Sequence, residues 1–179
     1  TLFRSETQFR GSLDDLVAVR RALDGAGVPR PLLRKDFIID RYQLVEARLA
    51  GADAALLIVA ALDDGQLASL FQAALDLALT PLVEVHDRSE LTRALALDPP
   101  LIGINNRDLR DFSVSLEITR RLRPLVPPPC LVVSESGIRG PEQMRALAEM
   151  GVDAALIGES LVTAPDPAAA LRVLKEAGR

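Results

Sequence analysis

The sequence has 179 residues, a formal net charge of −4, and 49% apolar residues. A chain of this size can bury one substantial core, so we expect a single domain over 1–179 and exclude a disordered chain. Its basic residues are scattered and form no stripe with aromatic residues, which argues against nucleic-acid binding. No apolar run reaches the roughly 18 residues of a membrane helix, and the segment TLFRSETQFR lacks the apolar core of a signal peptide. We therefore predict a cytoplasmic protein with no membrane segment.

Helices and strands alternate along the chain. A short apolar start at Leu2 precedes a helix that Ser12 caps and that Gly25 or Gly27 ends. A strand at Leu32 leads to a helix over 41–51. Further strands are predicted over 54–60, 82–85, 101–104, 131–134 and 154–158, with helices over 63–78, after Asp87, over 115–123, after Pro141 and after Pro167.

This alternation predicts an α/β fold. Strands recur about every 25 residues, giving about seven strands joined by single helices, and such units build a parallel sheet. The segment GADAALL at Gly51 returns as GVDAALI at Gly151, which indicates regular construction, although alanine-rich junctions can look alike by chance. A doubly wound sheet and a (β/α)8 TIM barrel both fit. Polar residues end nearly every strand, as expected at a barrel mouth, so we favour the TIM barrel.

The stretch PLLRKDFIID places Lys35 at the carboxyl end of a short buried strand, with Asp40 positioned to cap the next helix. Lys35 and Lys175 are the only lysines among 21 Lys and Arg residues. In LVEVH, Glu84 shares a strand face with Leu82 and His86. Burial raises the pKa of a carboxyl group and a nearby ammonium lowers it, so Glu84 and Lys35 could act as base and acid. A buried ion pair that only holds the sheet together is the alternative.

Other strand ends carry further candidates. Glu135 offers a second acid. Asn105 and Asn106 stand directly before Arg107, where an amide beside a guanidinium suits carboxylate recognition, although asparagine also favours turns. Gly137 and Gly158 follow the last two strands, where such barrels often bind phosphate through backbone N–H groups.

Metal and cofactor sites are not expected. Cys130 is the only cysteine, which excludes an internal disulfide and a cysteine cluster, and a small buried apolar role is predicted for it. His86 is the only histidine, so we expect it to be a hydrogen-bonded structural residue. The sequence contains no nucleotide-binding glycine motif.

The motifs LRKDFIID, LVEVH, IGINNRDL, VSESGI and LIGESL, in this order, resemble the indole-3-glycerol-phosphate synthase family. The resemblance covers essentially the whole chain. It implies a carbon-carbon lyase of tryptophan biosynthesis that closes an indole ring on 1-(2-carboxyphenylamino)-1-deoxyribulose 5-phosphate, with loss of carbon dioxide and water and without a cofactor or metal. Another phosphate-binding barrel enzyme fits these motifs less well.

The resemblance also implies roles for individual residues. Lys35 matches the catalytic acid and Glu84 the base of the later steps, while Asn105, Arg107 and Glu135 match residues that orient the substrate. The phosphate-binding edge corresponds to Ser136, Gly137, Gly158 and Glu159, and the pocket aromatics to Phe9 and Phe37.

The sequence departs from the family pattern in two ways that affect the activity we expect. The family normally carries a further N-terminal region with a capping helix and the first βα unit, and Arg4 stands where threonine is usual. A chain lacking that unit would be a poor enzyme alone, with an open barrel edge that favours self-association or a partner. A non-catalytic, phosphate-binding or self-associating partial barrel is therefore the alternative function.

Overall fold

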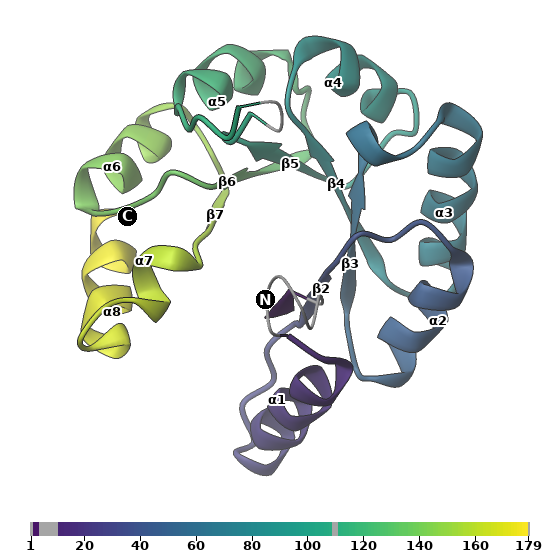
Figure 1. The fold of residues 1–179 in the computed structure, drawn as a ribbon. Helices are drawn as coiled ribbons and strands as arrows, with labels where there is room; N and C mark the ends of the chain where they lie inside the picture. The colour runs from purple at the N-terminus through teal and green to yellow at the C-terminus, as the bar shows by residue number, and fades with distance from the viewer. Residues whose placement is uncertain (1, 4–10, 109–110, 179) are drawn as a thin grey trace. The chain divides into compact units, whose positions relative to one another are not determined.

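The computed structural model describes residues 2–3, 11–108 and 111–178. Its internal contacts group into two compact units, Thr1–Glu84 and Val85–Arg179. Figure 1 shows the elements of both. Within the described ranges, every helix is too short or too polar to span a membrane. The single domain over 1–179 stays a prediction.

The first unit is built on parallel strands that follow one another in chain order. They are β1 (Leu2–Phe3), β2 (Leu33–Lys35), β3 (Ala54–Ile58) and β4 (Thr80–Val85). Its helices are α1 (Leu13–Gly25), α2 (Arg41–Leu49) and α3 (Asp64–Asp76), with a 3-10 turn, η1, at Val59–Ala61. Figure 1 shows α2 and α3 along one side of β3 and β4. Leu44 and Phe71, one from each helix, are buried there, so this face forms the core of the unit.

Local sequence explains where these helices begin. Ser12, Asp40 and Asp63 are the N-caps of α1, α2 and α3, and each forms a capping box with the third residue of its helix. The capping side chain accepts a hydrogen bond from an N–H group that has no partner within the helix. The predicted caps Ser12 and Asp40 are thus confirmed. Helix α1 ends at Gly25, as expected.

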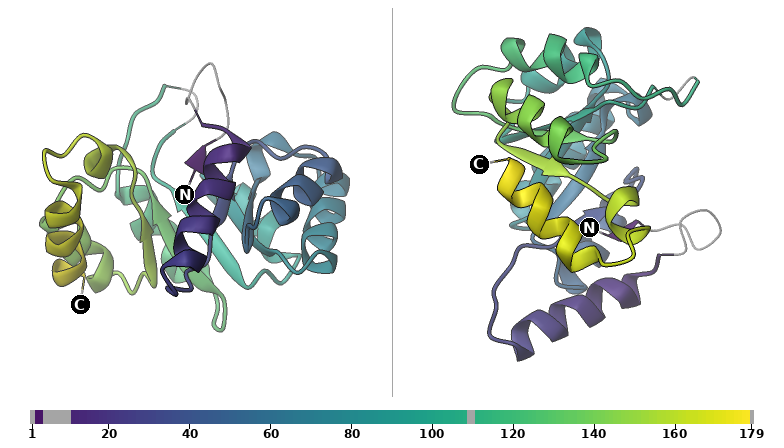
Figure 2. Two further views of the ribbon diagram at one scale, coloured as in Figure 1. Left: turned by 90° about the horizontal axis from the view of Figure 1, so that it is seen from below. Right: turned by 90° about the vertical axis from the view of Figure 1, so that its left-hand side faces the viewer.

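The second unit repeats the pattern. Strands β5 (Leu101–Asn105), β6 (Leu131–Glu135) and β7 (Ala154–Leu156) pair in parallel and in chain order. Its helices are α4 (Arg88–Leu95), α5 (Glu117–Leu122), α6 (Pro141–Glu149), α7 (Glu159–Val162) and α8 (Pro167–Ala177), with a 3-10 turn, η2, at Arg123–Leu125. Helix α6 packs against α8 (Figure 2).

The strand order distinguishes the two predicted architectures. A doubly wound sheet reverses its strand order at a switch point, whereas a barrel keeps the chain order. Within each unit the described strands keep the chain order, as the barrel prediction requires. Some details of the prediction were wrong, and the strand predicted over 154–158 ends at Leu156. The strand predicted through Ala60 ends at Ile58 because the backbone turns into η1, and the short helix α7 was missed.

The repeated segments at Gly51 and Gly151 perform the same task in the two units. Both glycines have a positive φ after a helix, +88° and +71°, a conformation that glycine adopts without a Cβ clash. The Oδ2 atom of Asp53 accepts a hydrogen bond from Leu32 N at 2.7 Å. In the second unit, Asp153 Oδ2 accepts one from Val132 N at 2.8 Å. Each aspartate therefore fixes the register between the start of its own strand and the preceding strand.

Candidate active site

The first unit contains a buried ion pair between two of the predicted site residues. Lys35 is the last residue of β2 and Glu84 lies near the end of β4, and Lys35 Nζ donates to Glu84 Oε2 at 3.0 Å. Lys35 is 6% exposed and Glu84 is 2% exposed. The predicted meeting of these two side chains is confirmed. Because water is nearly excluded, the ammonium and carboxylate act on each other and on a ligand more strongly than they would in solvent.

The preceding residue, Arg34, points to the opposite side of β2, as strand alternation requires. Its Nη2 atom lies 3.0 Å from Asp36 Oδ2 and 3.2 Å from Glu46 Oε2, and its Nη1 atom donates to the carbonyl oxygen of Gln43. Arg34 is 2% exposed. This cluster fastens the end of β2 to α2, and so it fixes the backbone that carries Lys35. No local pattern in the sequence indicates this cluster.

We expect Arg34→Met to lower the free energy of unfolding by about 3–5 kcal/mol, because it leaves two carboxylates without the buried guanidinium that they share. Urea denaturation would measure this change. Arg41→Met is the matched control at the exposed start of α2, where the change should stay within about 0.5 kcal/mol. Equal denaturation midpoints for the two variants would contradict the role given to Arg34.

The loop between β2 and α2 presents the predicted pocket aromatic. Phe37 is 49% exposed although it is a large apolar residue. Gln43 holds the loop: its Oε1 atom accepts from Ile39 N at 2.8 Å, and its Nε2 atom donates to Phe37 O at 3.0 Å. An aromatic ring held at the surface by a fixed backbone is available to a ligand. Phe9, the other predicted aromatic, lies outside the described residues.

His86 behaves as the structural histidine that the sequence predicts. Its Nδ1 atom lies 3.0 Å from Glu90 Oε2, and its backbone N donates to the same oxygen at 2.8 Å. Asp87, the N-cap of α4, accepts from Glu90 N at 2.9 Å. The imidazole is therefore held by a side chain from the first turn of α4.

In the second unit, Asn105 and Glu135 are register partners at the ends of β5 and β6. Both are buried, and Glu135 is only 1% exposed. Arg107 N donates to Asn105 Oδ1 at 3.1 Å, so the amide oxygen shapes the turn after β5. The turn interpretation therefore holds for Asn105, and its part in recognising a ligand stays a prediction.

The predicted phosphate-binding residues lie after β6 and β7. Ser136 and Gly137 both have a positive φ, +65° and +77°. Gly158 is the N-cap of α7. The Glu159 carboxylate is exposed and its Oε2 atom lies 3.9 Å from Arg107 Nη2. An anionic ligand that recruits Arg107 would therefore compete with Glu159 for the guanidinium.

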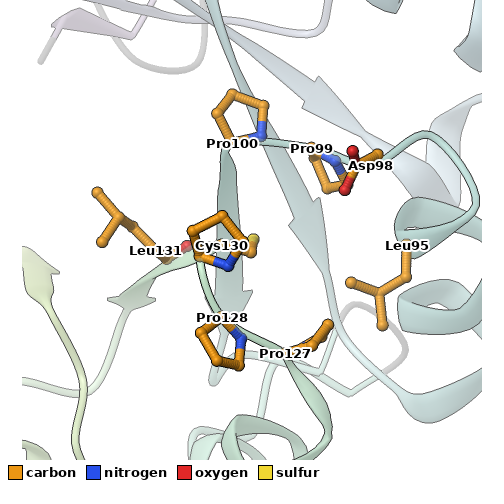
Figure 3. A pocket seen from close by; sticks show the side chains of 9 residues that line it. Leu95, Asp98, Pro99, Pro100, Pro127, Pro128, Cys130 and Leu131 are labelled. Carbon is orange, nitrogen blue, oxygen red and sulfur yellow. Dashed lines mark hydrogen bonds between the residues drawn. The ribbon is translucent and has the colours of Figure 1, made fainter.

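A separate hollow of about 460 Å³ lies at the opposite, amino-terminal ends of β5 and β6 (Figure 3). It is lined by the prolines of 99–100 and 127–129, together with Leu131 and Cys130. Cys130 is partly exposed, so its predicted buried role was wrong. Burial nonetheless raises the pKa of the Cys130 thiol, which disfavours the reactive thiolate at neutral pH. In barrel enzymes this end supports stability and the chemistry lies at the carboxyl ends of the strands.

Among residues 2–3, 11–108 and 111–178, no group of three or more His, Cys, Asp or Glu side chains is arranged to hold a metal ion.

The family model for indole-3-glycerol phosphate synthase matches residues 3–174. The chain belongs to this family. A curated relative from Roseiflexus castenholzii, named indole-3-glycerol phosphate synthase, is 54% identical to this chain over 169 residues. The match covers 93% of this chain and 63% of the relative. The relative in Dehalococcoides mccartyi is 50% identical over 174 residues, covering 97% and 66%. The chain thus spans just under two thirds of the length of these indole-3-glycerol phosphate synthases.

Solved structures give the fold. A 3-hexulose-6-phosphate synthase from Salmonella typhimurium matches with a TM-score of 0.78 at 16% identity, covering 94% of this chain and 81% of that one. A 3-keto-L-gulonate-6-phosphate decarboxylase from Vibrio cholerae matches with a TM-score of 0.70 at 15% identity, covering 92% and 78%. At these identities the similarity concerns the fold alone. The predicted TIM-barrel fold class is confirmed for this member of the indole-3-glycerol phosphate synthase family.

Proposed function

We propose that this protein is an indole-3-glycerol-phosphate synthase of tryptophan biosynthesis. It would convert 1-(2-carboxyphenylamino)-1-deoxyribulose 5-phosphate into indole-3-glycerol phosphate, carbon dioxide and water. Family membership over residues 3–174 supports the reaction. The single observation that carries the proposal is the buried contact of 3.0 Å between Lys35 Nζ and Glu84 Oε2, because ring closure needs an acid and rearomatisation needs a base.

The chemistry assigns a proton step to each member of the pair. The ring carbon that bears the substrate carboxylate attacks the ribulose carbonyl carbon, and the carbonyl oxygen takes a proton from the Lys35 ammonium. Loss of carbon dioxide then leaves its electron pair in the ring. The new hydroxyl then takes a second proton from Lys35, which has been reprotonated from solvent, and departs as water. Glu84 is the proposed base that removes the proton from the adjacent carbon beside the nitrogen, which completes the indole ring. Because water is nearly excluded from the Lys35–Glu84 pair, both side chains are already oriented before the substrate binds.

The remaining candidate residues are proposed as binding groups on the family match. Arg107 suits the carboxylate of the substrate because a guanidinium can donate two parallel hydrogen bonds to it. Asn105 and Glu135, both buried at the ends of β5 and β6, would orient the polar groups of the ribulose chain. Backbone N–H groups around Ser136, Gly137, Gly158 and Glu159 would hold the phosphate. Phe37 would contact the aromatic ring, and Phe9 is proposed for the same pocket on the family match.

The test is an assay of the full-length protein with the proposed substrate, in which indole-3-glycerol phosphate and carbon dioxide should appear in equal amounts. The same assay with a chelator should give the same rate if side chains alone do the chemistry. A matched substrate without the phosphate group should react with a much higher KM. Absence of both products at saturating substrate would refute the proposal. The cytoplasmic location stays a prediction.

A further inference from the structure

Asn106, next to the candidate Asn105, is a fully buried side chain with every hydrogen-bonding atom engaged. Its Nδ2 atom lies 2.9 Å from Ser134 Oγ, 2.9 Å from Glu135 O and 3.2 Å from Ser136 O. Its Oδ1 atom accepts from Thr119 N at 3.2 Å and from Thr119 Oγ1 at 2.8 Å. An amide has two N–H donors, so one of them is shared between acceptors.

The backbone of Asn106 is equally engaged. Its N–H donates to Glu135 O at 2.8 Å, and its carbonyl oxygen accepts from Ser115 N at 2.9 Å. Thr119 Oγ1 and Ser134 Oγ are 2.9 Å apart, which closes the network between α5 and β6. Asn106 therefore joins the end of β5, the end of β6 and α5. A turn residue would need none of these contacts.

The contact with Ser136 O has a particular consequence. Ser136 has a φ of +65°, which is costly for a residue with a Cβ, and Gly137 follows with a φ of +77°. Such a conformation persists only where surrounding groups hold it. The Asn106 amide donates hydrogen bonds to the carbonyl groups of both Glu135 and Ser136. These carbonyl groups lie directly where the backbone enters the left-handed region of positive φ. A Cβ on Gly137 would also lie 2.6 Å from Val114 Cγ1, so this turn has little room to shift.

We propose that Asn106 is a positioning residue that holds the Ser136–Gly137 turn in the conformation that binds the phosphate group of the substrate. This inference rests on the proposed function for its ligand. The turn would otherwise relax toward ordinary φ values and redirect its N–H groups. Asn106 itself touches no substrate atom. Its effect is on phosphate affinity, and it leaves the proton transfers of Lys35 and Glu84 in place.

The first test is Asn106→Ala in the full-length protein. We expect the Kd for inorganic phosphate and the KM for substrate to rise roughly 10- to 100-fold, because a misplacement of about 1 Å can cost a site up to about 100-fold. The kcat value at saturation should change much less. Phosphate binding is followed by calorimetry, so this readout requires no turnover. An unchanged phosphate Kd in a folded Asn106→Ala protein would overturn the inference.

Three further variants separate positioning from general stability. Ile102→Ala removes a fully buried side chain from β5 near its amino-terminal end and should lower the thermal midpoint without changing the phosphate Kd. Thr119→Val and Ser134→Ala remove hydroxyl groups from the network but keep the bonds from Asn106 to the two carbonyl groups, so phosphate affinity should stay near that of the wild type. If phosphate affinity falls in step with the thermal midpoint in all these variants, Asn106 is only a structural residue.

Two outcomes keep this inference distinct from the proposed function. A protein that makes no indole product but loses phosphate affinity on Asn106→Ala refutes the synthase activity and supports the positioning role. A protein that makes the product but binds phosphate equally well with and without the Asn106 side chain refutes only the positioning role. Should Asn106→Ala fail to fold, Asn106→Ser keeps a small polar side chain there and is judged by the same phosphate Kd.

Discussion

Replacement of Lys35 by alanine should lower kcat by about 100- to 10,000-fold, the usual contribution of a general acid, with only a small change in KM. The reason is that protonation of the carbonyl oxygen belongs to the transition state, whereas most binding contacts are made elsewhere on the substrate. Single-turnover measurement of indole-3-glycerol phosphate formation in the full-length protein would separate the chemical step from product release.

A charge-conserving variant sharpens the result for Lys35. Lys35→Arg keeps a cation that can pair with Glu84, but a guanidinium holds its proton too tightly to act as an acid. We expect it to fold and to bind substrate while remaining nearly as slow as Lys35→Ala. Lys175→Ala removes the other lysine, which is exposed near the end of α8, and should leave kcat unchanged. Wild-type turnover in Lys35→Arg would show that charge, not proton donation, is what Lys35 supplies.

The sequence predicts the Lys35 and Glu84 pair well because local pattern and side-chain alternation suffice. Each polar residue interrupts an apolar strand near its carboxyl end, and parallel strands bring such ends to one edge. The Arg34 cluster could not be predicted in this way. Arg34 and its partner Glu46 are 12 residues apart, and their contact depends on how α2 lies against β2. Only the packing of the helix on the strand reveals it.

Asn106 shows a second limit of the sequence. Adjacent asparagines favour either a turn or a recognition site, and both interpretations fit the local chain. The buried role depends on the pairing of β5 with β6, which places Ser134 beside Asn106, and on α5, which brings in Thr119. Helix α7 was missed for a different reason. It spans four residues, Glu159–Val162, too short for a helical pattern of apolar residues to emerge.

Glu84→Gln should also lower kcat by about 100- to 10,000-fold, because an amide cannot take the proton that rearomatisation releases. The change leaves the Lys35 ammonium without the carboxylate that lies 3.0 Å away, so the free energy of unfolding should fall as well, by about 3–5 kcal/mol. Turnover and urea denaturation are measured on the same preparation. Glu149→Gln, at an exposed position of α6, is the matched control and should alter neither quantity.

The double variant Lys35→Met with Glu84→Gln decides between a catalytic pair and a structural one. Removing both charges leaves no uncompensated charge at this buried position. The double variant should therefore regain part of the stability that either single variant loses. Its turnover should not recover, and it should lie close to that of the slower single variant, because an acid and a base of one reaction act as a unit. If turnover instead rises together with stability, the pair only holds the strands together, and the acid and base of the reaction must be sought among other residues.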